Sequence, residues 1–96
     1  MSLFPGQYIP IANSYQQIVG LVAATTLTVP TGALYALVQA QSVDVRWRDD
    51  GVAPTATVGT LLAANAPPQG FVGNLAALQF IQTSAGTSTL NVSYYK

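Results

Sequence analysis

The side chains that could do chemistry lie almost entirely in one short run. Five of the six charged residues of this 96-residue chain fall within seven consecutive positions, and the first 43 residues carry no charged side chain. Such a run suggests two kinds of chemistry: hydrolysis by two carboxyl groups across a cleft, or calcium binding through their oxygens. The charged residues of the run are Asp44, Arg46, Arg48, Asp49 and Asp50.

Neither chemistry suits the types and spacing of these residues. The two arginines favour ionised carboxylates, whereas a general acid must stay protonated. Neighbouring Asp side chains on a strand point apart, and the run lacks the spacing of a calcium loop. The chain has no His, Cys or Glu, which excludes the usual nucleophile–histidine pairs and structural zinc sites. We expect no enzymatic activity, no metal and no other cofactor.

The charged run has two interpretations, which are compatible with each other. In the first, a strand carries Arg46 and Arg48 outward and Trp47 into the core, then ends in an Asp-Asp-Gly turn whose carboxylates pair with the arginines. In the second, the same charges meet a neighbouring subunit and fix its register, because arginine forks and carboxylates make directional contacts.

The rest of the chain lacks the charge that usually keeps a monomeric domain dispersed. Charged residues make up 6% of the sequence, hydrophobic residues make up 50%, and the net charge is zero. We expect much of such a surface to be covered by other protein. A small core without disulfides or zinc also gains stability from oligomerisation. A homo-oligomer is therefore expected, with its partners on the uncharged first 43 residues.

Composition argues against other kinds of partner. A neutral chain offers no basic surface for nucleic acid or anionic lipid. The apolar stretch Ile18–Ala24 is far shorter than the roughly 20 residues of a membrane span. The N-terminus lacks the pattern of a cleavable signal. We expect no nucleic acid and no membrane as partner, and a protein made in the cytoplasm and not secreted through such a signal.

Strands, rather than helices, are expected to position these residues. Lys, Arg and Glu are nearly missing, while Thr, Val, Tyr and turn residues recur at intervals typical of short strands. The stretches Ile18–Ala24 and Ala33–Ala40 are apolar on both faces, which indicates central strands or strands covered by a partner; a short helix at 33–39 is the alternative for the second. Half-buried strands with alternating residues are expected at 26–29, 43–48, 78–80 and 90–95.

These patterns predict an all-β protein. The expected fold is a single β-sandwich or jelly-roll-like domain of about seven or eight short antiparallel strands. The domain is expected over residues 15–96. Residues 1–14, which include Pro5, Gly6 and Pro10, are expected to form an extended N-terminal arm.

The stretch Val45–Thr60, VRWRDDGVAPTATVGT, resembles small virion proteins encoded in the structural gene clusters of tailed bacteriophages. Two later segments extend the resemblance, LAALQFI at 75–81 and LNVSYY at 90–95, so that it covers about half of the chain. The resemblance implies a non-enzymatic virion component. Head decoration (cement) proteins are similar in size and are often β-sandwich trimers that lie on the capsid lattice.

We therefore expect a decoration protein on the surface of the phage head, a homotrimer that binds the major capsid protein and stabilises the shell. Apolar strand faces would pack against sister subunits, and the arm and the charged turn would contact the major capsid protein. The apolar and aromatic interface residues expected are Phe4, Tyr8, Ile9, Tyr35, Leu37 and Tyr95.

The alternative function is that of a fibre or tail-tip module that binds a host-surface glycan. Exposed aromatic rings can form a platform for sugars, although core packing explains most aromatic positions in this chain. Tyr95, which is expected to point outward beside the C-terminus, is the best candidate for such a platform.

Overall fold

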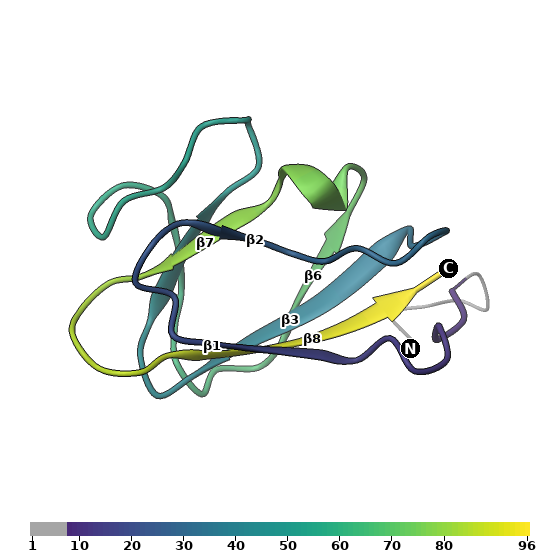
Figure 1. The fold of residues 1–96 in the computed structure, drawn as a ribbon, viewed down its shortest axis with the longest axis horizontal. Helices are drawn as coiled ribbons and strands as arrows, with labels where there is room; N and C mark the ends of the chain where they lie inside the picture. Colours follow the sequence, from purple (N-terminus) through teal and green to yellow (C-terminus); the bar gives the residue numbers. More distant parts are fainter. Residues whose placement is uncertain (1–7) are drawn as a thin grey trace.

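Residues 8–96, the part of the chain that the computed structural model describes, form two antiparallel sheets packed face to face (Figure 1). The elements are β1 Gln16–Val19, β2 Thr25–Thr26, β3 Tyr35–Gln41, β4 Val45–Arg48, β5 Thr60–Leu62, β6 Gln69–Val72, the 3-10 helix η1 Leu75–Ala77, β7 Gln79–Gln82 and β8 Thr89–Tyr95. The first sheet has the strand order β1-β8-β3-β6, and the second has the order β2-β7-β4-β5.

The eight strands pair as in one long antiparallel hairpin that folds over on itself. The four strand pairs of this hairpin are β1 with β8, β2 with β7, β3 with β6 and β4 with β5. Rolling the hairpin brings β3 beside β8 and β4 beside β7, which completes the two sheets. This is the jelly-roll topology. It confirms the prediction of an all-β sandwich.

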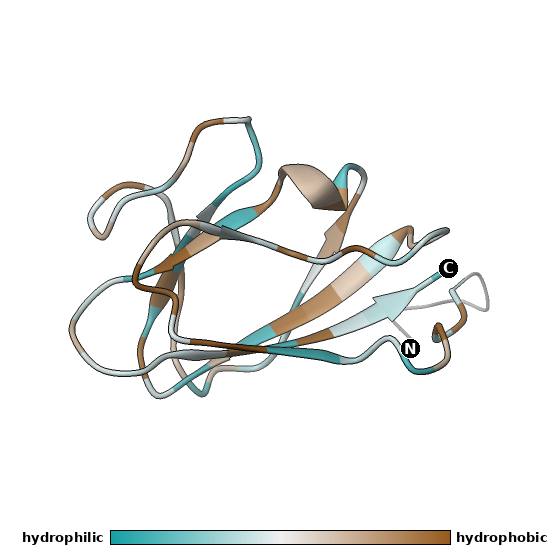
Figure 2. Cartoon of the chain, in the orientation of Figure 1, coloured by the Kyte–Doolittle hydropathy of each residue, from teal (hydrophilic) through white to brown (hydrophobic). Residues whose placement is uncertain are grey.

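The core lies between the sheets and follows from strand alternation. Figure 2 shows the hydrophobic stretch of β3 beside the more hydrophilic C-terminal part of β8. On β8, Leu90, Val92 and Tyr94 point inward and are buried, as the sequence predicted. The Tyr94 hydroxyl donates a hydrogen bond to Gln16 Oε1 (2.7 Å), so its polar group is satisfied inside the protein. Burial raises the pKa of Tyr94 to about 12.

The structure corrects two of the predicted strands and rules out the helix considered for a third segment. The stretch Ile18–Ala24 is not one strand, because β1 ends at Val19 and Gly20 adopts a left-handed conformation (φ +77°) that turns the chain. The strand expected at 26–29 is reduced to Thr25–Thr26, because the chain then crosses from the second sheet to the first. The helix considered at 33–39 is wrong, because β3 pairs with both β6 and β8.

The segment before β1 runs beside the end of β8. Ile9 and Lys96 exchange two backbone hydrogen bonds (2.7 and 2.8 Å), and the Ile11 N–H donates to the Tyr94 carbonyl (3.0 Å). The described part of the expected arm is therefore paired with the sandwich, next to the C-terminus (Figure 1). Phe4, an expected interface residue, lies outside the described residues.

Across residues 8–96, no helix is long and apolar enough to cross a membrane.

Candidate functional site

The strand β4 carries the charged run and presents its arginines outward. Because side chains alternate along the strand, Val45 is buried in the core and Trp47 packs edge to face against Phe71, with ring centroids 4.8 Å apart. Arg46 and Arg48 therefore point away from the core, as the sequence predicted. They lie on the outer face of the second sheet, where each has its own partners.

Arg46 holds the long connection between β4 and β5. Its Nε donates to the Ala56 carbonyl (3.1 Å), and its Nη1 donates to the Gly59 carbonyl (2.9 Å). Pro54 is buried in the same connection, and a Cβ on Gly59 would lie 3.1 Å from Arg46 Cβ. The connection thus folds back over Arg46, whose partners are two backbone carbonyls rather than the expected aspartate.

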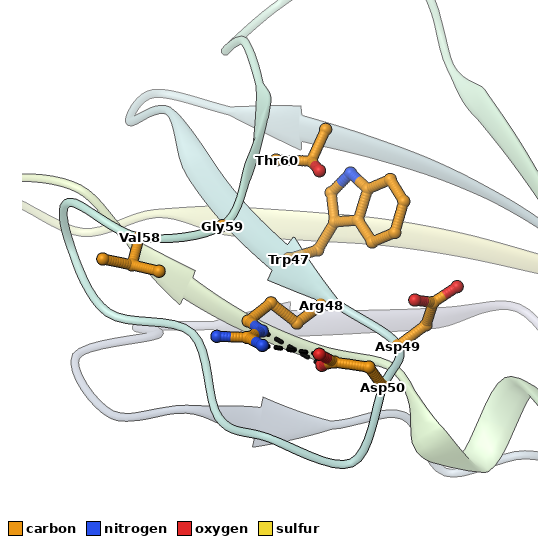
Figure 3. Close-up of a pocket in the computed structure, with 7 residues that line it drawn as sticks. All are labelled: Trp47, Arg48, Asp49, Asp50, Val58, Gly59 and Thr60. Carbon is orange, nitrogen blue, oxygen red and sulfur yellow. Dashed lines mark hydrogen bonds and ion pairs between the residues drawn. The ribbon is translucent and has the colours of Figure 1, made fainter.

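Arg48 forms the kind of ion pair that the sequence predicted. Its Nε donates to Asp50 Oδ1 (3.0 Å) and its Nη2 to Asp50 Oδ2 (2.5 Å), in two-pronged geometry (Figure 3). The hydrogen bonds from Arg48 lower the pKa of the Asp50 carboxyl, and the same bonds raise the pKa of Arg48. Because Asp50 is exposed, the pair orders the turn more than it stabilises the fold.

The Arg48–Asp50 pair forms one wall of an open pocket of about 460 Å³ at the end of β4 (Figure 3). Beside it, the indole Nε1 of Trp47 is buried and has no hydrogen-bond partner within residues 8–96. Asp49 is exposed and points away from the ion pair (Figure 3). The pocket offers an aromatic ring, a carboxylate and the hydroxyl of Thr60, but no hydrogen bond joins a nucleophile to a base among them.

Asp44 is separated from the other two carboxylates by the length of β4. Its Oδ1 accepts a hydrogen bond from the backbone N–H of Ala64 (2.7 Å), which fixes the connection after β5. Five residues of extended chain place its Cα about 17 Å from that of Asp49. Two Asp side chains are too short to bridge this distance and bring their carboxyl groups to the roughly 5–10 Å of a glycosidase pair. Among residues 8–96, no three potential metal ligands come together. The run is therefore continuous in sequence but divided in space.

A second surface, the outer face of the first sheet, contains no charged side chain. The registers of β1, β8, β3 and β6 align its outward residues in rows across the four strands. We call this surface the neutral face. Its residues are Tyr15, Gln17, Val19, Tyr35, Leu37, Gln39, Gln41, Gly70, Val72, Thr89, Asn91, Ser93 and Tyr95.

Amide groups form the centre of the neutral face. Asn91 Oδ1 accepts hydrogen bonds from the Tyr15 hydroxyl (2.6 Å) and from Gln17 Nε2 (3.0 Å). Asn91 Nδ2 in turn donates to Gln41 Oε1 (2.7 Å). These bonds link side chains of β1, β8 and β3 into a network without formal charge. The face is therefore polar enough to be hydrated although none of its side chains is charged.

Aromatic rings cover one end of the neutral face. The Tyr35 ring lies 5.1 Å from that of Tyr8 and 5.7 Å from that of Tyr95, centroid to centroid. It also lies across Gly70 on the neighbouring strand, where a Cβ would come within 1.8 Å of the Tyr35 hydroxyl oxygen. Burial, followed by the proximity of Tyr95 and Tyr8, raises the pKa of Tyr35. The cluster fixes the start of the described chain to the sheet.

The structure divides the expected interface residues between these two surfaces. Tyr35, Leu37 and Tyr95 belong to the neutral face, and Tyr8 packs against it. Ile9 is exposed at the same end of the sandwich. Sequence reasoning missed the amide network, although the uncharged alternate positions of β8 were its visible signal. The neutral face combines β1 and β3 from the first 43 residues, where partners are expected, with β6 and β8 from the second half of the chain.

Comparisons with protein-family models, curated proteins and solved structures found no match for this chain. The structure therefore defines the fold class of this protein. It is a small jelly-roll domain of eight strands with two chemically different outer faces.

Proposed function

We propose that this protein is a non-enzymatic structural component of a tailed phage particle. It acts as a decoration protein on the head surface, where it binds the major capsid protein lattice as a homo-oligomer, with a trimer as the expected form. The resemblance of residues 45–95 to small virion proteins supports this proposal. One observation of the structure carries it: charge is separated between the two outer faces of a small sandwich.

The two faces suit two different protein surfaces. The second sheet presents Arg48 and Asp50 beside an exposed Asp49, a polar group able to set the register of a contact with the shell. The first sheet presents the neutral face. A decoration protein that acts as a homo-oligomer contacts both the shell and its sister subunits, and a molecule with one charged and one uncharged face has a separate surface for each.

The proposed mechanism is mechanical. Each subunit makes a small contact with the shell, and any one contact of this size binds weakly. An oligomer makes several such contacts at once, so that the second and third contacts form at a high effective concentration. Binding across the boundaries between capsid subunits then opposes their separation and stabilises the shell.

Mixing the purified protein with capsids assembled without it tests the proposal. Co-sedimentation with the capsids, together with added density on the head surface in electron micrographs, is the expected result. Asp49→Lys reverses one charge of the proposed contact and should weaken the binding, while Thr31→Lys, in the exposed turn between β2 and β3, should not. Wild-type protein that stays in the supernatant would contradict the proposal.

A glycan-binding module is the second candidate, and the pocket beside Trp47 favours it. An aromatic ring, the exposed Asp49 and the Thr60 hydroxyl are groups that can hold a neutral polyol. A glycan array decides between the two functions. A reproducible glycan signal that is lost in Asp49→Ala, which leaves the core untouched, would favour recognition of a host surface over capsid decoration.

A further inference from the structure

We infer that the neutral face is a self-association surface, covered in the assembled state by a second copy of this chain. The inference deepens the proposed function, because it rests on the proposed homo-oligomer and names the face through which two copies meet. A contact between two identical faces is two-fold and closes as a pair, so it gives a dimer in place of the expected trimer.

Charge complementarity favours a second copy over a charged partner. The neutral face carries no formal charge, so a second neutral face approaches it without repulsion and without stripping water from an ion. A charged partner would lose hydration and gain no opposite charge in return. The second sheet is less suited to a flat self-contact, because the β4–β5 connection folds back over its outer face at Arg46.

Apolar side chains border the neutral face at both edges. On the β1 edge, Tyr15 is 61% exposed and Val19 is 60% exposed; on the β6 edge, Val72 is 65% exposed. Leu37 lies half-buried between them on β3. Exposed apolar groups mark interaction sites, and a single partner that covers both edges must be broad and flat. The face of another sheet has that shape.

The polar centre of the face can bind a copy of itself. Amide side chains carry both donors and acceptors, so Asn or Gln can pair with the same residue type across an interface. In a two-fold contact each pairing occurs twice, because the same patch is presented by both copies. Gln39 Nε2 makes only a long hydrogen bond to the Ala66 carbonyl (3.3 Å), so this amide can turn toward a partner at small cost.

The area of the neutral face matches a small, weak interface. Its width is about 19 Å for four strands, and the seven residues of β3 and β8 give a length of about 24 Å. Because β1 and β6 have only four residues each, each copy contributes roughly 350 Å² and two copies bury about 700 Å², the size of a weak, transient contact. Association of this size is reversible in solution and becomes tighter when a lattice holds the copies together.

Light scattering during gel filtration tests the inference on the purified chain. The wild-type protein is expected to show a concentration-dependent mass that reaches at least twice the 10.0 kDa of one chain. Leu37→Glu places a carboxylate in the middle of the neutral face and should raise the dissociation constant at least about tenfold, because a buried charge without a partner opposes association. Leu61→Glu makes the same change on the outward side of β5 and should leave association unchanged.

Circular dichroism and the thermal midpoint establish that both variants are folded. If Leu37→Glu does not fold, Ser93→Glu on β8 repeats the test at a neighbouring position of the same face. A wild-type chain that stays monomeric up to its solubility limit would overturn the inference, and so would equal association of Leu37→Glu and wild type.

The capsid assay separates this inference from the proposed function. Wild-type protein that self-associates through the neutral face but does not bind capsids contradicts the proposed function alone. A monomer that binds capsids contradicts the inference and the proposed homo-oligomer, but leaves the proposed binding to the capsid in place. If that capsid binding is lost in Leu37→Glu, the neutral face is a contact for the capsid protein rather than for a second copy.

Discussion

At the scale of single residues, two arginines on the same side of one strand have different roles. Arg46 donates to two backbone carbonyls of the β4–β5 connection, whereas Arg48 pairs with the carboxylate two residues further on. The first contact joins β4 to a distant part of its connection, and the second lies within a single turn. Arg46 therefore fixes the β4–β5 connection, whereas Arg48 and its partner lie together in one turn at the surface.

Replacing Arg46 is expected to destabilise the protein. Arg46→Met keeps the aliphatic stem but removes both hydrogen bonds, which should lower the free energy of unfolding by about 1–2 kcal/mol. Arg48→Met is the matched control and should have the smaller effect. Urea unfolding of the two variants measures the difference. Equal losses would show that the connection does not depend on Arg46.

Tyr94 should make stability depend on alkaline pH. Its pKa is about 12 in the folded protein against an ordinary value of 10.0. The neutral phenol is therefore favoured by folding: the stabilisation is complete below pH 10 and is lost as pH rises toward 12. The loss should approach about 3 kcal/mol, since one pKa unit corresponds to about 1.4 kcal/mol and the two pKa values differ by about two units.

Urea unfolding at pH 8, 10 and 11 measures this dependence, with Tyr94→Phe as the control. The variant lacks the hydrogen bond to Gln16, so it should start from a lower stability at pH 8 and then fall less steeply. Some slope should remain, because the pKa of Tyr35 is also raised. Identical pH profiles for wild type and variant would contradict the assignment to Tyr94.

At the scale of elements, alternation in the sequence predicted which strands are half-buried and which way they face. Leu90, Val92 and Tyr94 were placed inward correctly because period-two alternation is a local property. The end of β1 was missed because the apolar residues continue through Gly20 into the turn, where Leu21 still enters the core. Hydropathy alone does not distinguish a buried turn residue from a strand residue.

The pairing of strands could not be predicted in the same way. Gln16 of β1 lies opposite Val92 of β8, and nothing local to either strand specifies the other. The amide network was missed for this reason, since Gln17, Asn91 and Gln41 lie on three strands that only the rolled hairpin brings together. The charged run shows the converse, because Asp44 and Asp49 are near in sequence but lie at opposite ends of β4.

The contact between Tyr35 and Gly70 ties β3 to the edge strand β6. Gly70→Ala should lower the free energy of unfolding by about 1–3 kcal/mol, because the added methyl group would overlap the Tyr35 ring and force it off the strand. In a Tyr35→Ala background the same change should be neutral or stabilising, since alanine is otherwise preferred to glycine in a strand.

Thermal unfolding of the two single variants and the double variant gives the coupling between these residues. Val72→Ala, on the outward side of the same edge strand, is the control and should have little effect. A Gly70→Ala cost that persists without Tyr35 would mean that the glycine is required for backbone reasons instead.

At the scale of the whole molecule, the few charges are concentrated on one of the two sheets. All three Asp and both Arg lie on β4 or immediately beside it, and Lys96 lies at the end of β8. The neutral face thus contains no charged side chain, and the charged residue next to it in sequence is Lys96. An interface formed through it depends on apolar contact and amide pairing, whose strength responds weakly to ionic strength.

Self-association should therefore be nearly independent of salt. Between roughly 0.05 and 0.5 M NaCl the dissociation constant should change by less than about threefold, because no ion pair is screened at the interface. Sedimentation equilibrium across this range provides the measurement. A steep weakening with salt would indicate that the charged turn, and not the neutral face, joins the copies.

The pairing of Ile9 with Lys96 determines where peptides added near either position would lie on the molecule. Because the two residues exchange backbone hydrogen bonds, a peptide inserted before Ile9 and one fused after Lys96 would emerge from the same pole of the sandwich. On a decorated particle, both fusions would then be displayed to solvent together or both would collide with the shell. Antibody access to a tag at either position would report which pole of the protein faces outward.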